Sequence, residues 1–213
     1  MKKLLLLCSS ILVLGSVAQA APCVSGSLDS YVALGAGGCE FEGLTFSNFQ
    51  LLTVPFGATE LPSINITVNP LMAGPMGGTG LEFALTVAAG AGSYLASSFQ
   101  YDVSPFVIPV LTSVELTGAM AMGDGVVTAL TIANGTALIA LVDGFSSLPF
   151  SSSVIPAAMP FTVLTEIGVD GGPGGSASFT AASNRFSQVP EPSAWLLTAT
   201  GLLAAGAISR RKA

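Results

Sequence analysis

Apolar and polar residues alternate along many short segments between residues 21 and 187. Apolar side chains occupy the odd positions of 81–87, and a second such segment covers 99–103. Because the side chains of a strand point alternately to two faces, this period of two predicts strands with one buried face. The pattern recurs in five further segments, which are 64–68, 114–116, 126–132, 161–167 and 176–181. We expect roughly eight to ten short strands.

Turn signals separate these segments. Gly123-Asp124-Gly125, Asp143-Gly144 and Gly171–Gly175 are typical of tight turns, and no segment between the two ends of the chain shows a helical stripe. All twelve phenylalanines lie between residues 21 and 187, where we expect most of them to pack between sheets. The pattern therefore predicts one all-β domain over 21–187, an antiparallel β-sandwich of the jelly-roll or immunoglobulin-like type.

The N-terminal residues have the order of a secretory signal peptide. Lys2 and Lys3 precede an apolar run over 4–14, and Ala18 and Ala20 are small residues at alternate positions. This order predicts a signal helix over 1–20 that signal peptidase removes after Ala20. An uncleaved anchor is the alternative, but the apolar run is short for a bilayer span.

The C-terminal residues predict a transmembrane helix. Residues 193–209 carry no charge, and their length is at the low end of what a membrane span needs. Arg210, Arg211 and Lys212 follow directly. By the positive-inside rule these three residues stay in the cytoplasm, so the domain would lie on the outer side of the inner membrane.

Pro190, Glu191 and Pro192 stand just before this apolar span. Prolines on both sides of Glu191 favour an extended and accessible segment. The motif, the span and the basic end together resemble the PEP-CTERM sorting signal of Gram-negative bacteria, which would make 188–213 a sorting tail. The resemblance implies that an exosortase recognises Pro190, Glu191 and Pro192 and that the tail is discarded or exchanged. A permanent tail anchor is the alternative.

The charge of the predicted domain limits its partners. Eleven acids stand against one basic residue, Arg185, a formal net charge of −10 between the two targeting ends. Such a surface repels phosphate backbones and anionic lipid, which excludes nucleic-acid binding. Contact with the inner membrane is expected only transiently, through the C-terminal helix.

Cysteine usage agrees with export. Cys8 would leave with the signal peptide, so Cys23 and Cys39 remain as a pair. An oxidising compartment favours a disulfide between them, worth about 3 kcal/mol for a loop of this length. The alternatives, a metal pair or a redox dithiol, would need a Cys-x-x-Cys spacing or nearby histidine.

Catalytic chemistry has few candidates in this chain. The sequence contains no histidine, no Gly-x-Ser-x-Gly motif and, between the targeting ends, no lysine. Carboxylates remain, and a pair of them could serve glycoside hydrolysis as acid and base. The six candidates are Glu40, Glu42, Glu60, Glu82, Glu115 and Glu166. Glu82, Glu115 and Glu166 alternate with apolar neighbours as ordinary outward-facing residues do, and we therefore expect no enzyme.

Two ligand classes stay open. Asp124, Asp143 and Asp170 each precede glycine and could contribute to a calcium site, although Asp-Gly is also a common turn dipeptide. We expect no bound cofactor and no dedicated metal site.

Carbohydrate binding is the second class. Sugar-binding faces carry exposed Trp or Tyr, and the domain offers three tyrosines, which are Tyr31, Tyr94 and Tyr101.

These observations favour an exported protein of the cell surface or extracellular matrix. The role that they predict is structural or adhesive, within exopolysaccharide or a biofilm. The alternative is a carbohydrate-binding protein or a glycan-acting enzyme with paired carboxylates.

Overall fold

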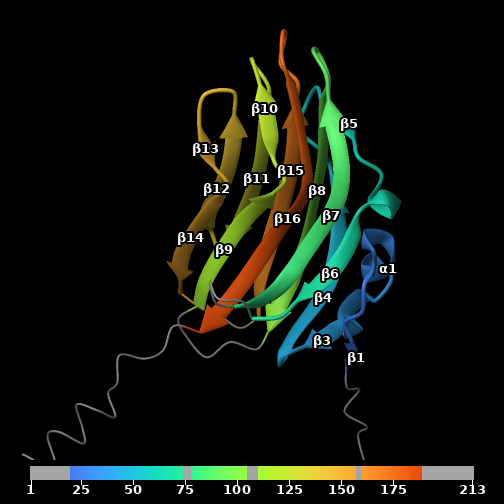
Figure 1. The fold of residues 1–213 in the computed structure, drawn as a ribbon. Coiled ribbons are helices and arrows are strands. Elements are labelled where there is room, and N and C mark those ends of the chain that lie inside the picture. The colour runs from blue at the N-terminus through green and yellow to red at the C-terminus, as the bar shows by residue number, and fades with distance from the viewer. Residues whose placement is uncertain (1–19, 74–77, 105–109, 157–159, 189–213) are drawn as a thin grey trace, which may run out of the picture.

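The computed structural model describes residues 20–73, 78–104, 110–156 and 160–188, which form two β-sheets packed face to face (Figure 1). Sheet A contains, in order, β1 (Ala21–Pro22), β3 (Cys39–Phe41), β4 (Leu44–Leu52), β8 (Tyr94–Ser104), β15 (Phe161–Asp170), β11 (Val126–Ala133), β12 (Thr136–Asp143) and β13 (Ser147–Leu148), with β5 (Thr59–Glu60) beside β8. Sheet B contains β14 (Phe150–Ile155), β9 (Val110–Thr117), β16 (Ser176–Gln188), β7 (Thr79–Ala89), β6 (Thr67–Leu71) and β2 (Gly26–Ser27), with β10 (Met120–Met122) beside β16. The predicted β-sandwich is confirmed.

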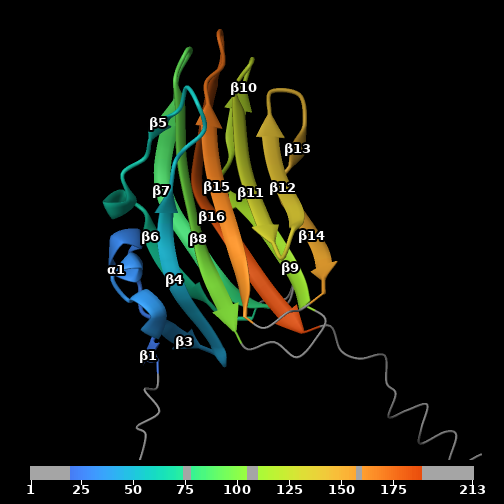
Figure 2. The ribbon, with the colours of Figure 1, turned by 180° about the vertical axis from the view of Figure 1, so that it is seen from behind.

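The strand order is that of a jelly roll. The last two strands insert into the sheets, so that β16 lies between β7 and β9 while β15 lies between β8 and β11. The eight strands of this topology form two four-stranded sheets, in the orders β7-β16-β9-β14 and β8-β15-β11-β12. β6 extends the first of these sheets beyond β7, and β4 extends the second beyond β8. Figure 2 shows sheet A from its outer face, with β4, β8, β15, β11 and β12 side by side.

One short helix left no signal in the sequence, and one expected strand was wrong. The chain forms a five-residue helix, α1 (Leu28–Val32), which is too short to leave a helical stripe in the sequence. Ser27 caps it, since its hydroxyl accepts a hydrogen bond from the Ser30 N–H. Residues 64–68 were expected to be one strand. A 3₁₀ turn, η2 (Ser63–Asn65), follows Pro62 instead, which leaves Ile64 61% exposed and starts the strand at Thr67.

Aromatic rings fill the space between the sheets, as the phenylalanine pattern predicted. Tyr101 stacks on Phe49 with ring centres 5.0 Å apart, and Phe83 contacts Phe99 at 4.6 Å. The buried residues of this aromatic core include Phe46, Phe49, Phe83, Phe99, Tyr101 and Phe186. Burial raises the pKa of the Tyr101 hydroxyl.

The polar side chain of Asn184, on sheet B, enters this core. Asn184 on β16 is only 1% exposed, and its amide nitrogen donates to the Tyr101 hydroxyl at 3.0 Å and to Thr165 Oγ1 at 2.7 Å. Thr131 Oγ1 donates to the Asn184 carbonyl oxygen at 2.7 Å. The three partners belong to β8, β15 and β11 of sheet A. Asn184 therefore ties the two sheets together through a network in which every polar atom of its side chain has a partner.

The predicted disulfide is present between Cys23 and Cys39, with an S–S distance of 2.06 Å and Cα atoms 4.8 Å apart. Both cysteines are buried, and the bond lies beside the parallel pairing of Ala21 with Cys39. Structural disulfides of this kind belong to proteins of oxidising compartments such as the periplasm and the cell exterior.

Both ends of the domain lie at the same end of the sandwich. In Figure 1, β1 and the C-terminal end of β16 lie at the bottom, whereas the turns between β7 and β8 and between β15 and β16 lie at the top. Within the described ranges, no helix has the length and apolar character that a membrane crossing needs. Residues 1–19 of the predicted signal peptide fall outside those ranges, as do residues 189–213 of the predicted sorting tail 188–213.

Candidate functional site

The six candidate carboxylates are spread over both sheets. Glu42 lies in the β3–β4 turn, where it accepts hydrogen bonds from the Ala73 N–H and the Thr79 hydroxyl. Glu40 is half-buried on β3, and Glu60 is exposed on β5. Glu42 therefore stabilises the backbone at Ala73 and the start of β7 at Thr79. Neither Glu42 nor Glu40 pairs with another of the six glutamates across strands.

Glu82 and Glu115 are brought onto one row of sheet B. Both pair with Ser183 of β16, from opposite sides, and all three point away from the core because Asn184 points into it. Two strand spacings separate the backbones of the two glutamates, about 9.6 Å. Asn69 Nδ2 donates to Glu82 at 3.0 Å. The expectation that Glu82, Glu115 and Glu166 face outward is confirmed, since all three are half-buried on outer faces.

Two of the three aspartates that precede glycine, Asp143 and Asp170, stabilise turns. Asp143 Oδ1 accepts hydrogen bonds from the N–H groups of Phe145 and Ser146, at 2.7 and 2.6 Å, and these bonds lower the pKa of the Asp143 carboxyl. Asp170 accepts one from the Gly172 N–H at 2.8 Å. Among the described residues, no three acids or cysteines come together in a way that could hold a metal ion.

The three tyrosines differ in their surroundings. Tyr31 and Tyr101 are buried, and burial raises the pKa of the Tyr31 hydroxyl to about 12. Tyr31 donates a hydrogen bond to the Val24 carbonyl at 2.9 Å. Tyr94, the first residue of β8, is the tyrosine whose ring reaches the surface. It is therefore the one tyrosine of the domain that could stack on an external ligand.

Tyr94 lies across the neighbouring strand β15. It pairs with Asp170, yet its Cε2 and hydroxyl oxygen lie only 3.4 and 3.5 Å from the point where a Cβ on Gly168 would stand. Thr128 Oγ1 lies 2.9 Å from the same point. The missing side chain of Gly168 makes room for the ring, so β15 forms a flat floor under Tyr94. Ala96 and Ser98, both small and buried, continue this floor on β8.

Carboxylates stand on both sides of the Tyr94 ring. Asp170 and Glu166 occupy the same outer face of β15 as Gly168, two residues to either side of it. Burial first, and then the charges of Glu166 and Asp170, raise the pKa of the Tyr94 hydroxyl, which places both carboxylates within electrostatic reach of the ring. Burial also raises the pKa of Glu166.

A second aromatic side chain lies at the same end of β8. β4 and β5 both pair with β8, so the loop 53–58 between them turns beside the first residues of that strand. Phe56 in this loop is 106% exposed, and Glu60 pairs with Ala96 at the level of Gly168. We call Phe56, Glu60, Tyr94, Glu166, Gly168 and Asp170 the Tyr94 face. Its members come from β5, β8, β15 and one loop, and no sequence motif joins them.

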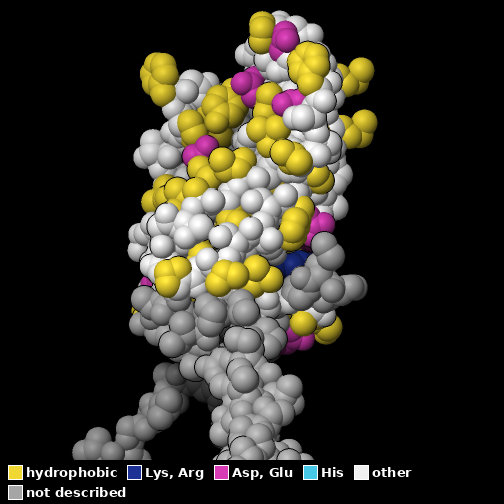
Figure 3. All heavy atoms as spheres, turned by 90° about the vertical axis from the view of Figure 1, so that its left-hand side faces the viewer, with side chains coloured by type: hydrophobic (Ala, Val, Ile, Leu, Met, Phe, Trp, Pro, Cys, Tyr) yellow, Lys and Arg dark blue, Asp and Glu magenta, His cyan; other side chains and the backbone are white. Residues whose placement is uncertain are grey.

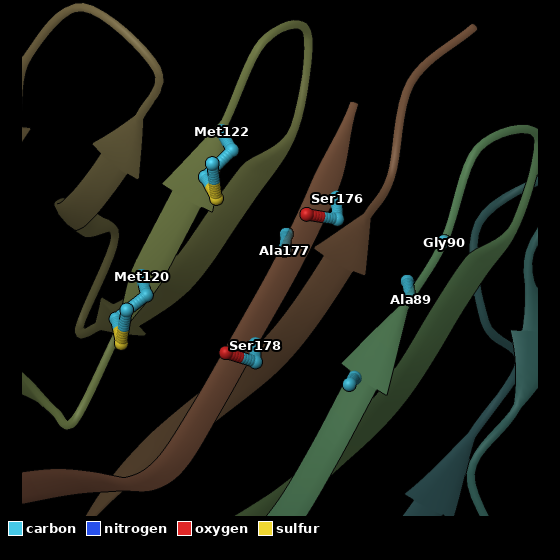
Figure 4. Close-up of a pocket in the computed structure, with 8 residues that line it drawn as sticks. Ala89, Gly90, Met120, Met122, Ser176, Ala177 and Ser178 are labelled. Atoms are coloured by element: carbon cyan, nitrogen blue, oxygen red, sulfur yellow. The ribbon is translucent and has the colours of Figure 1, made fainter. Parts of the chain in front are cut away.

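Two other surface features are apolar. Met120 and Met122 project from β10 beside Ser176 and Ser178 of β16, and this groove of about 270 Å³ extends to Gly90 after β7 (Figure 4). Figure 3 shows apolar side chains gathered on the edge of the sandwich formed by β10, β12, β13 and β14. The exposed ones there are Met120, Met122, Ile139, Phe145, Leu148, Phe150 and Val154. Ser176 and Ser178 are the polar side chains that line the groove, no charged side chain lines it, and we assign no ligand to either surface.

No protein-family model matches the chain, and no curated protein matches it. Among solved structures, it is similar to the enzymatically active domain of bacteriophage CBA120 tailspike protein 4, at 13% identity and a TM-score of 0.28 over 75% of this chain. It spans about a fifth of that protein, 21%. It is also similar to TmCBM61, solved in complex with beta-1,4-galactotriose, at 12% identity and a TM-score of 0.27, covering 76% of this chain and 94% of the other. Likenesses at these scores carry no argument about function.

Proposed function

We propose that this chain is an exported adhesion protein whose jelly roll binds extracellular polysaccharide through the Tyr94 face. The observation that carries the proposal is the position of Tyr94, whose ring lies over Gly168 between Glu166 and Asp170. This position supports the adhesive role that the sequence predicts. Under the proposal, adhesion occurs through carbohydrate binding.

The chemistry of the Tyr94 face suits a sugar chain. A pyranose ring has an apolar face of C–H groups that stacks on an aromatic ring, and its hydroxyls donate hydrogen bonds to carboxylates at the edge of the stack. Tyr94 offers the ring, while Glu166 and Asp170 offer the acceptors. An aromatic ring on the outer face of a sheet suits an extended polymer better than a small molecule, which would be held in an enclosed pocket.

The position of the Tyr94 face agrees with attachment at the opposite end. Tyr94 begins β8 at the top of the sandwich, and β16 runs downward to Gln188. The ten residue steps of β8 alone span about 33 Å. A domain held through its C-terminal end would therefore present the Tyr94 face away from its anchor.

The route to the surface is the second part of the proposal. Signal peptidase cuts after Ala20, and the tail anchors the domain briefly in the inner membrane until an exosortase acts at Pro190, Glu191 and Pro192. The buried disulfide supports passage through an oxidising compartment. Intact-mass measurement on protein from native cells tests this part. We expect a mass that starts at Ala21 and lacks the residues after the motif, and a full-length mass in the membrane would refute processing.

Affinity electrophoresis tests the binding part. The exported chain is run through native gels that contain neutral, amino or anionic polysaccharide, and retardation by one of them is the expected result. Tyr94→Ala should abolish the retardation. Phe145→Ala is the matched control, because Phe145 is 93% exposed but lies in the turn between β12 and β13. Equal retardation of the Tyr94→Ala and wild-type chains would refute the Tyr94 face as the binding site.

A further inference from the structure

The charges around Tyr94 are all of one sign. Glu166 and Asp170 approach the ring from β15, and Glu60 stands on the other side of β8 at the level of Gly168. β11 contributes the uncharged Thr128. Arg185 is the sole cation among the described residues, and it lies on sheet B, where it donates to the Met72 carbonyl at 3.1 Å.

We propose that the Tyr94 face selects an amino polysaccharide, a chain of hexosamine units whose amino groups are free and protonated. This inference rests on the proposed function, and it specifies which class of polysaccharide is bound. An anionic chain of uronic acids would meet three carboxylates and no cation, whereas a neutral chain would gain only stacking and hydrogen bonds.

The ring and the carboxylates favour an ammonium group for separate reasons. An ammonium above the face of a tyrosine is attracted by the ring quadrupole. A carboxylate accepts a charge-assisted hydrogen bond from the same group, and such bonds are roughly twice as strong as neutral ones. Tyr94 and Asp170 are direct neighbours across two strands, so one ammonium can contact both.

The spacing of the acids suits a repeating ligand. Asp170 and Glu166 are four residues apart on the same outer face of β15, about 13 Å along the strand. Gly168 lies midway between them, and the Tyr94 ring lies over it. A polymer that lies along β15 can therefore place the amino groups of different units against the two carboxylates, while a sugar ring between them stacks on Tyr94.

Two oligosaccharides that differ at the 2-amino group, which is free and protonated in one and acetylated and neutral in the other, test the inference. A hexamer of glucosamine and a hexamer of N-acetylglucosamine have the same ring and linkage, and both are titrated calorimetrically into the full-length chain at about pH 6, where carboxylates are ionised. We expect the glucosamine hexamer to bind about tenfold more tightly, as two partly exposed charge contacts and one cation–π contact imply. Added salt should reduce this preference.

Matched variants locate the effect. Glu166→Gln/Asp170→Asn removes two charges from the Tyr94 face, and Glu82→Gln/Glu115→Gln removes two from the outer face of sheet B. The first variant should lose the preference for glucosamine and the second should keep it. If both variants lose it equally, the polycation binds the acidic domain as a whole, and the inference is overturned.

The remaining outcomes separate this inference from the proposed function. If both hexamers bind equally and Tyr94→Ala removes the binding of both, the polysaccharide site stands and selection for amino groups is refuted. Tighter binding of an anionic oligogalacturonate would refute it as well. If none of the three ligands binds and no polysaccharide retards the chain in the native gels, the proposed function fails together with the inference.

Discussion

Replacing Asn184 by alanine should destabilise the fold strongly. The substitution removes one acceptor and two donors from a site that is 1% exposed, and it leaves the hydroxyls of Thr131, Thr165 and Tyr101 without this partner. A buried polar group that loses its partner costs about 1–3 kcal/mol. Three such groups, which share part of the loss, amount to about 3–5 kcal/mol, a large part of the about 5–15 kcal/mol that stabilises a typical domain.

Guanidinium unfolding followed by far-UV circular dichroism measures the loss, with the disulfide kept oxidised. Ser187→Ala is the control, because Ser187 lies three residues after Asn184 on β16, on the outer face and only half-buried, and it should change stability by less than about 0.5 kcal/mol. In a Thr131→Val background, Asn184→Ala should cost about 1–2 kcal/mol less than in the wild type, since Thr131 no longer needs an acceptor. A loss below about 1 kcal/mol for Asn184→Ala, or no coupling with Thr131, would refute the role of the network.

Three further predictions concern the disulfide and the Tyr94 face. Reduction of the Cys23–Cys39 bridge should lower the free energy of unfolding by about 3 kcal/mol, and an unchanged guanidinium midpoint in reductant would contradict this. Burial raises the pKa of Glu166, so the folded chain keeps this proton to a higher pH than the unfolded chain, and stability falls as the pH rises from the ordinary carboxyl value through the folded one. Glu166→Gln should therefore raise the melting temperature at about pH 7 but not at about pH 3, where both states are protonated, and scanning calorimetry at the two values decides. Gly168→Val should displace the Tyr94 ring and abolish retardation in polysaccharide gels while circular dichroism stays unchanged; retained binding would mean that the ring is not the platform.

The alternation of residues predicted the long strands well where one face is apolar. Leu81 and Phe83 are fully buried on β7, as their spacing indicated. The prediction for β16 stopped at Ala181, although the strand continues to Gln188. Asn184 interrupts the apolar face there, and only the fold supplies the three partners that make a buried amide acceptable. Local pattern alone cannot reveal partners on strands that are distant in sequence.

The Tyr94 face could not be predicted from the sequence, for a related reason. Tyr94 was one of three candidate tyrosines, and neither its exposure nor its neighbours followed from its own segment. The site exists because β8 pairs with β15 in the register that places Tyr94 opposite Asp170, and because Gly168 leaves room for the ring. Pairing between strands so far apart depends on the whole topology. The predicted strand ended at residue 167, whereas β15 continues through Gly168 to Asp170.

The most direct test of the polysaccharide site is a chemical-shift map of the ¹⁵N-labelled full-length chain titrated with the glucosamine and N-acetylglucosamine hexamers. The structure predicts shifts concentrated at Tyr94, Gly168 and Asp170, with both ligands perturbing the same residues and the amino form doing so at lower concentration. Shifts concentrated instead at Ser176 and Ser178 in the methionine groove of sheet B, with the Tyr94 face unchanged, would contradict it.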